Sequence, residues 1–265
     1  SGLLFGTTHS GSITVHGVTA AGSNHINHIL SFVQSRDDGQ ITFSTTASTF
    51  NAVAVQADNG ILVNADLTSD VDGIYLDGDL ENASTADALN TLGFTDGRTV
   101  IAKTELTLES STGGLVPAGT LTLKAGRGVV ILDHMTGEAK GKALVIHSDF
   151  ESAGDGTLTL VTTKLINTND SDMVITAWDI DLAGTMTTGT ATPCIHGAKD
   201  TQKLGLGGTA KDMHISDLEL QRMTTSSGLL FGTTHSGSIT VHGVTAAGSN
   251  HINHILSFVQ SRDDG

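Results

Sequence analysis

Residues 52–78 have the sequence AVAVQADNGILVNADLTSDVDGIYLDG, and this stretch decides the fold. It contains three short β-type runs, at residues 52–57, 60–65 and 73–78, separated by glycine and small polar residues. Across these and related runs apolar and polar residues mostly alternate, which places one set of side chains inward and the other outward. Glycine, Asp, Asn, Ser and Thr between the runs are typical of turns. We therefore expect short strands with one solvated face.

Similar runs recur along the whole chain. They occupy residues 12–17, 40–45, 105–110, 120–125, 129–133, 143–148, 157–162, 173–178 and 203–208. The separations between run starts are also similar, as from Gln40 to Gly60, from Ala52 to Ile74, from Thr157 to Ile180 and from Ile180 to Lys203. A coil of about 20 to 25 residues with two or three strands is what a β-solenoid needs, because stacked coils pair in parallel about 4.8 Å apart.

The predicted fold class is therefore all-β, a β-solenoid of stacked coils. An antiparallel sandwich is the alternative, because the pairs Asn59-Gly60 and Asp77-Gly78 are also typical of β-hairpin turns. Two segments interrupt the strand pattern and predict short helical excursions at corners. Residues 84–92 contain helix-forming residues, and Ser216 with Glu219 has the spacing of a helix capping box.

One 39-residue string, SGLLFGTTHSGSITVHGVTAAGSNHINHILSFVQSRDDG, occurs at residues 1–39 and again at residues 227–265, at an offset of 226. Repetition at a fixed period is typical of solenoids and arrays. We expect residues 1–226 to be one full tandem repeat, and residues 227–265 to begin the next identical repeat with no linker between them. At the coil spacing above, a repeat of roughly ten coils advances about 50 Å. We also expect both ends of the chain to lie inside a longer protein.

The join between the repeats is the first candidate site. The capping-box segment lies just before it, and we expect the inter-repeat junction to involve Ser216, Glu219, Met223, Leu229, Leu230 and Phe231. Neighbouring identical repeats in the same chain are accordingly the first expected partners.

The composition indicates a thin aliphatic core and a paired backbone. The chain has 32 Gly, 38% apolar residues and only 4% aromatic residues. It has only two prolines, Pro117 and Pro193, and proline cannot donate to a hydrogen-bond ladder. The single cysteine, Cys194, excludes a disulfide framework within one repeat. A buried or half-buried thiol is the expected state, with a disulfide between filaments as the alternative.

The charge is strongly acidic, with 13 Lys and Arg against 28 Asp and Glu and a net charge of -15. Nucleic acids bind through Lys and Arg that displace counterions from phosphates, so we expect no nucleic-acid partner. No stretch approaches the roughly 18 apolar residues of a membrane span, and no basic and apolar leader is present. An acidic surface repeated along an array favours a self-repelling, soluble rod.

The candidate metal ligands are few and scattered. His25 and His28 are three residues apart, but no cysteine or third ligand completes a tetrahedral site. Acidic groups leave calcium open as an alternative, but they fit neither the calcium loop nor the nonapeptide pattern. We expect no metal site and no cofactor, with Ca²⁺ as the alternative. The acidic residues concerned are Asp77, Asp79, Glu81, Asp170 and Asp172.

The sequence also predicts no catalytic site. Hydrolases and lyases on β-helices need acidic or basic groups converging in one groove, whereas the carboxylates here are dispersed among glycine-rich corners. Asn82 and Asn169 each begin an N-glycosylation sequon. Thr-x-Thr elements at residues 120–122 and 157–159 leave ice or carbohydrate binding along a solenoid face as a minor alternative.

A family resemblance emerges from the last third of the repeat. Residues 203–208, 212–224, 228–232 and 237–243, with residues 173–184 before them, resemble filamentous-haemagglutinin-type adhesins and long-repeat extracellular proteins of unicellular algae. The resemblance implies a right-handed parallel β-helix exported to a cell surface or an extracellular fibre. It transfers no catalytic residue.

We therefore expect a non-enzymatic, extracellular or cell-surface building unit of a filament made of tandem β-solenoid repeats. The alternative is the stalk of an adhesin whose binding tip lies outside this chain. Lateral filament contacts and cell-surface partners remain open in either case.

Overall fold

The computed structural model describes residues 2–82 and 89–260, and these residues form a parallel β-helix. Strands are short and stack in register onto strands of the next coil, as the sequence predicted. Each of the twelve predicted runs overlaps a strand. The antiparallel sandwich is wrong, because the strands on either side of Asn59-Gly60 each pair in parallel with strands of other coils.

The chain divides into two compact units, which are described separately. The first unit is Ser1–Leu123 with Val130–Glu138, and the second is Lys124–Val129 with Ala139–Gly265. Two strands, β14 (Leu121–Ala125) and β15 (Gly128–Ile131), contain residues of both. Neither unit begins or ends at residue 226, so the repeat boundary there stays a prediction.

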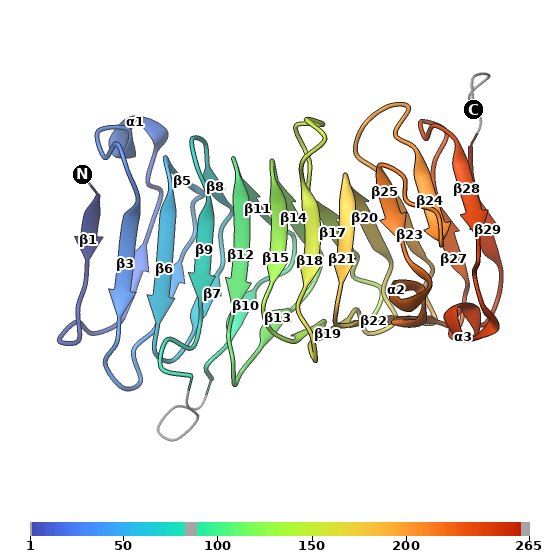
Figure 1. Cartoon of the computed structure of the whole chain (residues 1–265). Helices are drawn as coiled ribbons and strands as arrows, with labels where there is room; N and C mark the ends of the chain where they lie inside the picture. Colours follow the sequence, from blue (N-terminus) through green and yellow to red (C-terminus); the bar gives the residue numbers. More distant parts are fainter. Residues whose placement is uncertain (1, 83–88, 261–265) are drawn as a thin grey trace. The chain divides into compact units, whose positions relative to one another are not determined.

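In the first unit the strands form three rows, and within a row each strand pairs with the equivalent strand of the next coil (Figure 1). The first row is β1 (Leu3–Phe5), β3 (Leu30–Gln34), β6 (Val53–Ala57), β9 (Ile74–Asp77) and β12 (Glu105–Glu109). The second is β2 (Ile13–Val15), β4 (Ile41–Phe43), β7 (Ile61–Val63), β10 (Leu92–Phe94), β13 (Leu115–Pro117) and β16 (Met135–Thr136). The third is β5 (Ser48–Phe50), β8 (Leu67–Ser69) and β11 (Arg98–Ala102).

The second unit has the same construction. Its longest row is β17 (Leu144–His147), β20 (Met173–Ala177), β23 (Pro193–Gly197), β27 (Leu229–Phe231) and β29 (Leu256–Phe258). Two further rows are β18 (Thr157–Leu160) with β21 (Asp179–Leu182), and β19 (Leu165–Asn167), β22 (Thr185–Gly189) and β26 (Met223–Thr225). A small sheet has the order β25 (Met213–Ile215), β24 (Leu204–Gly207) and β28 (Ile239–His242).

The predicted coil length holds for the regular coils. Ile41 pairs with Ile61, and Met173 pairs with Pro193, so in both cases the chain returns to its row after one coil of the expected length. Other coils are longer, since the next partner of Ile61 in its row is Leu92. The spacing from Ile180 to Lys203 does not correspond to a direct pairing of β21 with β24, because β25 pairs with β24 and contacts β21.

The core is a thin stack of inward side chains, as the composition indicated. In β6, β14 and β20 buried and half-buried residues alternate strictly, which is the two-residue period of a strand. Several of the few aromatic residues gather at one place in the first unit. Phe32 lies edge-on to Phe43 and Phe50, with ring centres 6.3 and 5.8 Å apart, a favourable aromatic geometry.

Short helices occupy corners of the described coils: α1 (Ala20–Ser23), α2 (Asp217–Gln221) and α3 (Ala246–Ser249). The excursion predicted at residues 84–92 lies mostly outside the described residues, and its last residue, Leu92, opens β10. Across residues 2–82 and 89–260, no helix combines the length and the apolarity needed to cross a membrane.

Candidate functional site

The predicted junction residues lie in one region of the second unit, where the second copy of the 39-residue string packs onto the coil before it. Met223 is buried in β26 and pairs with Met186. Leu229 and Phe231 are 1% and 0% exposed, and Leu230 between them points outward and is half-buried. These apolar residues, which the sequence analysis assigned to the junction, therefore lie in paired strands, and three of the four are buried.

The capping box is formed as its spacing predicted. The Ser216 Oγ accepts a hydrogen bond from the Glu219 amide at 3.2 Å, and the Glu219 Oε2 accepts one from the Ser216 amide at 2.8 Å. The other carboxylate oxygen of Glu219 accepts from the Leu182 amide at 3.2 Å. Arg222 donates from Nη1 to the Leu182 carbonyl at 2.6 Å. Helix α2 is therefore capped internally and tied to the end of β21, which fixes the corner before the second copy.

The junction contains one contact that the sequence did not predict. Asp217, at the start of α2, accepts hydrogen bonds from both the amide and the hydroxyl of Thr245, at 2.8 and 2.7 Å. Thr245 is the N-cap residue of α3 in the second copy. A Cβ added at Gly248 would lie 2.0 Å from the Asp217 Oδ1, so glycine is needed for this close approach. The sequence alone does not indicate that Asp217 is the partner of Thr245, because this contact depends on how two coils stack.

Backbone hydrogen bonds also join the second copy to the preceding coil at several places. The Gly232 amide donates to the Ile195 carbonyl at 2.8 Å, beside the pairing of β27 with β23. The Leu204 amide donates to the Ser238 carbonyl at 3.0 Å, where β24 meets β28. The Thr225 amide donates to the His251 carbonyl at 3.1 Å. Each of these bonds connects strands or bridges of successive coils.

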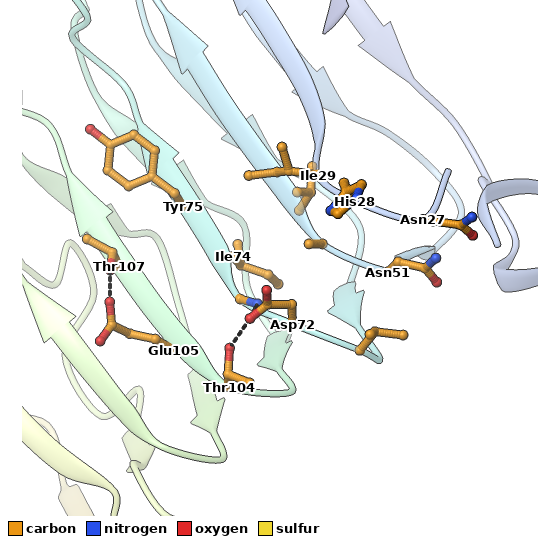
Figure 2. Close-up of a pocket in the computed structure, with 14 residues that line it drawn as sticks. Asn27, His28, Ile29, Asn51, Asp72, Ile74, Tyr75, Thr104, Glu105 and Thr107 are labelled. Atoms are coloured by element: carbon orange, nitrogen blue, oxygen red, sulfur yellow. Dashed lines mark hydrogen bonds between the residues drawn. The ribbon is translucent and has the colours of Figure 1, made fainter. Parts of the chain in front are cut away.

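A separate groove of about 430 Å³ lies in the first unit, where the chain enters β3, β6, β9 and β12 (Figure 2). Its polar lining comes mainly from the turns that precede these strands, namely Asn27 and His28, Asn51, Asp72, and Thr104. Val71 and Ile29, which are 60% and 43% exposed, add apolar surface to its walls.

The acidic side chains of the groove are already hydrogen-bonded by their neighbours. The Asp72 Oδ1 accepts from the Thr104 hydroxyl at 2.7 Å and from the Gly73 amide at 2.9 Å. The Glu105 Oε1 accepts from the Thr107 hydroxyl at 3.1 Å. Figure 2 shows both hydroxyl contacts running along the groove wall. The bond between Asp72 and Thr104 joins turns of adjacent coils and stabilises the stack.

A polar cluster lies on the outward face further along the same strands. Gln56, Asp77 and Glu109 are in register across three coils. The Tyr75 hydroxyl donates to Glu109 at 2.6 Å and lies 3.4 Å from Asp77. Burial raises the pKa of the Asp77 carboxyl, and the Glu109 charge raises it further. Burial and the bond to Glu109 raise the pKa of the Tyr75 hydroxyl, so the tyrosine remains a donor and links the coils.

The acidic residues named as calcium candidates do not converge. Asp79 is fully buried, and its Oδ2 accepts from the amide and hydroxyl of Thr112 at 2.8 and 2.7 Å. Glu81 is exposed, and Asp77 belongs to the cluster on β9. Within the described part of the chain, no group of three or more His, Cys, Asp or Glu side chains is arranged to hold a metal ion.

The second acidic pair has a different role. Asp170 forms an ion pair with Lys140 at 2.5 Å and accepts from the Thr190 amide at 2.9 Å. The bonds from Lys140 and Thr190 lower the pKa of the Asp170 carboxyl. Asp172 is exposed, and its carbonyl accepts from the Leu144 amide at 2.9 Å. The two aspartates thus connect coils through separate bonds.

Several remaining candidates lie at the surface. His25 and His28 are both exposed, and His28 lines the groove. Asn82 is exposed and Asn169 half-exposed, each with a positive φ, and the sequon of Asn82 ends at residue 84, which lies outside the described residues. The Ser171 hydroxyl of the Asn169 sequon is buried and donates to the Ala139 carbonyl at 3.2 Å.

The threonine and cysteine candidates are placed on outward faces. Thr157 and Thr159 pair in register with Asp179 and Asp181, so the Thr-x-Thr element does not extend as threonines onto β21. Cys194 is a half-buried free thiol in β23, and burial raises the pKa of that thiol.

Comparison with protein-family models, with curated proteins and with solved structures finds no match to this chain.

Proposed function

We propose that the chain is a structural, non-enzymatic building unit of an extracellular filament made of tandem β-solenoid repeats. The observation that carries the proposal is the junction: the second copy pairs with the coil before it through β27 and β23, and through β28 and β24. A repeat that begins as an ordinary coil on the previous one can be added many times. Each added repeat gains stability mainly from its nearest neighbour.

The hydrogen-bonding pattern supports a mechanical role. Parallel pairing satisfies the backbone along the rows, and the buried aliphatic side chains contribute about 25 cal/mol for each Å² of apolar surface removed from water. Outward polar side chains are used mainly for bonds between coils, as in the Tyr75 cluster and the Asp170–Lys140 pair. The function proposed for this arrangement is to span distance with a stiff rod.

Imaging of native material tests the proposal. Antibodies raised against the chain should label long filaments outside the cell, and aligned filaments should give a reflection near about 4.8 Å along the filament axis, the spacing of stacked coils. Antibody absorbed with the purified chain is the control. Labelling confined to a stalk below a distinct tip would favour the adhesin alternative, and labelling of dispersed material without filaments would refute the fibre.

A further inference from the structure

Two carboxylate oxygens in the groove of the first unit have no hydrogen-bond partner among the described residues. The bonds from Thr104 and Gly73 go to the Oδ1 of Asp72, and the bond from Thr107 goes to the Oε1 of Glu105 (Figure 2). The Asp72 Oδ2 and the Glu105 Oε2 are therefore open acceptors. Glu105 begins β12, which pairs with the strand that follows Asp72, so the two carboxyl groups lie on adjacent coils.

Beside these oxygens the groove has apolar surface and no ammonium or guanidinium group. Val71, next to Asp72 in the chain, is 60% exposed. None of the described residues that line the groove is a lysine or an arginine, and its basic group is the imidazole of His28. A lysine side chain matches such a surface, since its aliphatic stem packs on apolar groups and its ammonium group donates hydrogen bonds. Bonds from an ammonium group to a carboxylate are also stronger than bonds between neutral groups.

The strands beside the groove are paired on both sides. In their sheet β6 lies between β3 and β9, β9 between β6 and β12, and β12 between β9 and β15. Residues 51–107, which supply most of the lining, lie outside the 39-residue string. The groove is therefore shaped by coils stacked within the repeat.

The second unit carries three exposed lysines that form no ion pair with the described residues, Lys199, Lys203 and Lys211, here called the basic corner. Lys203 precedes β24, and its carbonyl accepts from the Met213 amide of the neighbouring β25 at 3.1 Å. Lys211 precedes β25, and a Cβ added at Gly205 of β24 would lie 3.0 Å from its Cγ. The stem of Lys211 thus lies over β24, close to Lys203.

The aspartates of the same segment are already engaged. The Asp212 Oδ2 accepts from the Lys203 amide at 2.9 Å, and the Asp200 carboxylate lies 3.4 Å from His235. Basic side chains elsewhere form ion pairs with aspartates, namely Arg98, Arg127 and Lys140. The ammonium groups of the basic corner are thus open to a partner outside the molecule.

We propose that a lysine of the basic corner of one molecule enters the groove of a second copy. Its ammonium group bonds to the open oxygens of Asp72 and Glu105, and its stem packs on Val71. The inference rests on the proposed function and deepens it, because it names a lateral contact between filaments.

A second copy is the fitting occupant because of charge complementarity. With a net charge of -15, two copies repel each other over most of their surfaces, and contact is favoured where a basic surface meets an acidic one. One exposed ion pair contributes little. In filaments of one repeat, however, the groove and the basic corner recur with the same spacing, so many weak contacts act together.

Zero-length cross-linking between isotope-labelled pools of the full chain tests the inference. Unlabelled and ¹⁵N-labelled chains are mixed at low ionic strength, where exposed charges are least screened, and a carbodiimide couples carboxylates to amines in contact. We expect mixed-isotope peptides that join residue 72 or 105 to residue 199, 203 or 211. The variant Asp72→Asn with Glu105→Gln should lose these links. Mixed-isotope links spread over other carboxylates in equal yield would overturn the inference.

Charge reversal gives a second test with a matched control. Asp72→Lys with Glu105→Lys should raise the Kd of self-association in sedimentation by roughly tenfold. Asp37→Lys with Glu81→Lys makes the same change in net charge at exposed carboxylates that do not line the groove. This control should associate at least as well as the native chain, because repulsion between copies is reduced. Equal behaviour of the two variants would contradict the inference.

The complementary reversal completes the test. Adding Lys203→Glu and Lys211→Glu to the groove variant restores the native net charge and should restore association, whereas no recovery would count against the contact. If the reversed chain loses its strand signal in circular dichroism, Asp72→Asn with Glu105→Gln replaces it, because the amide oxygens still accept from Thr104 and Thr107. Single, unbundled filaments in native material would overturn the lateral contact and leave the proposed function standing.

Discussion

The two copies of the 39-residue string have one sequence and opposite patterns of burial. Phe5 is 55% exposed in the first copy, whereas the equivalent Phe231 is fully buried in the second. Further along, the order reverses: Phe32 is 6% exposed in the first copy, and the equivalent Phe258 is 43% exposed in the second. In this structure the first copy stacks on the coil after it, and the second copy stacks on the coil before it. Burial in this fold is therefore decided by the neighbouring coil.

Local structure is nevertheless the same in both copies. Thr19 and Thr245 cap four-residue helices with similar backbone angles, φ −91° and −93°. In each copy the strand at its start pairs with the strand at its end in the same register. Short-range interactions thus set the shape of a coil, and stacking sets its stability, as expected of a repeat protein with nearest-neighbour coupling.

The largest expected loss of stability comes from removing the buried ring of Phe231 at the junction. Phe231→Ala should lower the free energy of unfolding of the second unit by about 3–5 kcal/mol, because it leaves a cavity in a packed core. Phe5→Ala removes an exposed ring and should cost less than about 1 kcal/mol. Urea unfolding followed by circular dichroism measures both. Equal losses would mean that β23 does not cover the second copy.

For the equivalent residues Phe32 and Phe258, the loss of stability should be larger in the first copy than in the second. Phe32→Ala removes a ring that lies against three others, with centres 5.8 to 6.3 Å away, and should cost about 3–4 kcal/mol. Phe258→Ala, at the exposed end of the second copy, should cost about 1 kcal/mol. The same unfolding measurement applies, and a larger loss for Phe258→Ala would contradict the stacking direction.

A smaller difference is expected at the helix caps. Thr19→Val and Thr245→Val each remove an N-cap bond and should each cost about 1 kcal/mol. Thr245→Val also removes the hydroxyl that donates to Asp217, which should add about 1 kcal/mol. In a double-mutant cycle with Asp217→Ala, the additional cost of Thr245→Val over Thr19→Val should disappear when Asp217 is already replaced. An undiminished extra loss would assign it to another contact.

The smallest effect is expected at the surface. His235 of the second copy lies 3.4 Å from Asp200, with side chains 74% and 73% exposed, and exposed ion pairs contribute little. His235→Ala and His9→Ala should therefore give unfolding free energies within about 0.5 kcal/mol of each other. A clear excess for His235→Ala would show that this ion pair helps to hold the junction.

Much of the fold followed from sequence because alternation and coil length are local signals. The runs around Val53, Leu121 and Met173 became strands, and coils without insertions return to their rows after nearly the same length of chain. Other strands were missed, such as β5 and β26, because three residues with Ser or Thr among them carry too little apolar pattern. Their place is set by the strands stacked on them.

The junction could be predicted only in part, because its contacts between coils are not local signals in the sequence. Leu229 and Phe231 were recognisable as apolar residues at the repeat boundary, and the capping box has a fixed spacing. The bond between Asp217 and Thr245, and the groove lined by Asp72 and Thr104, join residues from different coils. Such contacts depend on the register of stacking, which a single sequence does not encode in any short motif.

Amide hydrogen exchange followed by NMR tests the central claim most directly, because identical sequences have the same intrinsic exchange rates. The account predicts that the Gly232 amide, bonded to Ile195, exchanges at least about a hundredfold more slowly than that of Gly6. It also predicts the opposite order for Phe32 and Phe258, with Phe32 the slower. Equal rates in the two copies, or the same copy slower at both positions, would contradict the stacking of one repeat on the next.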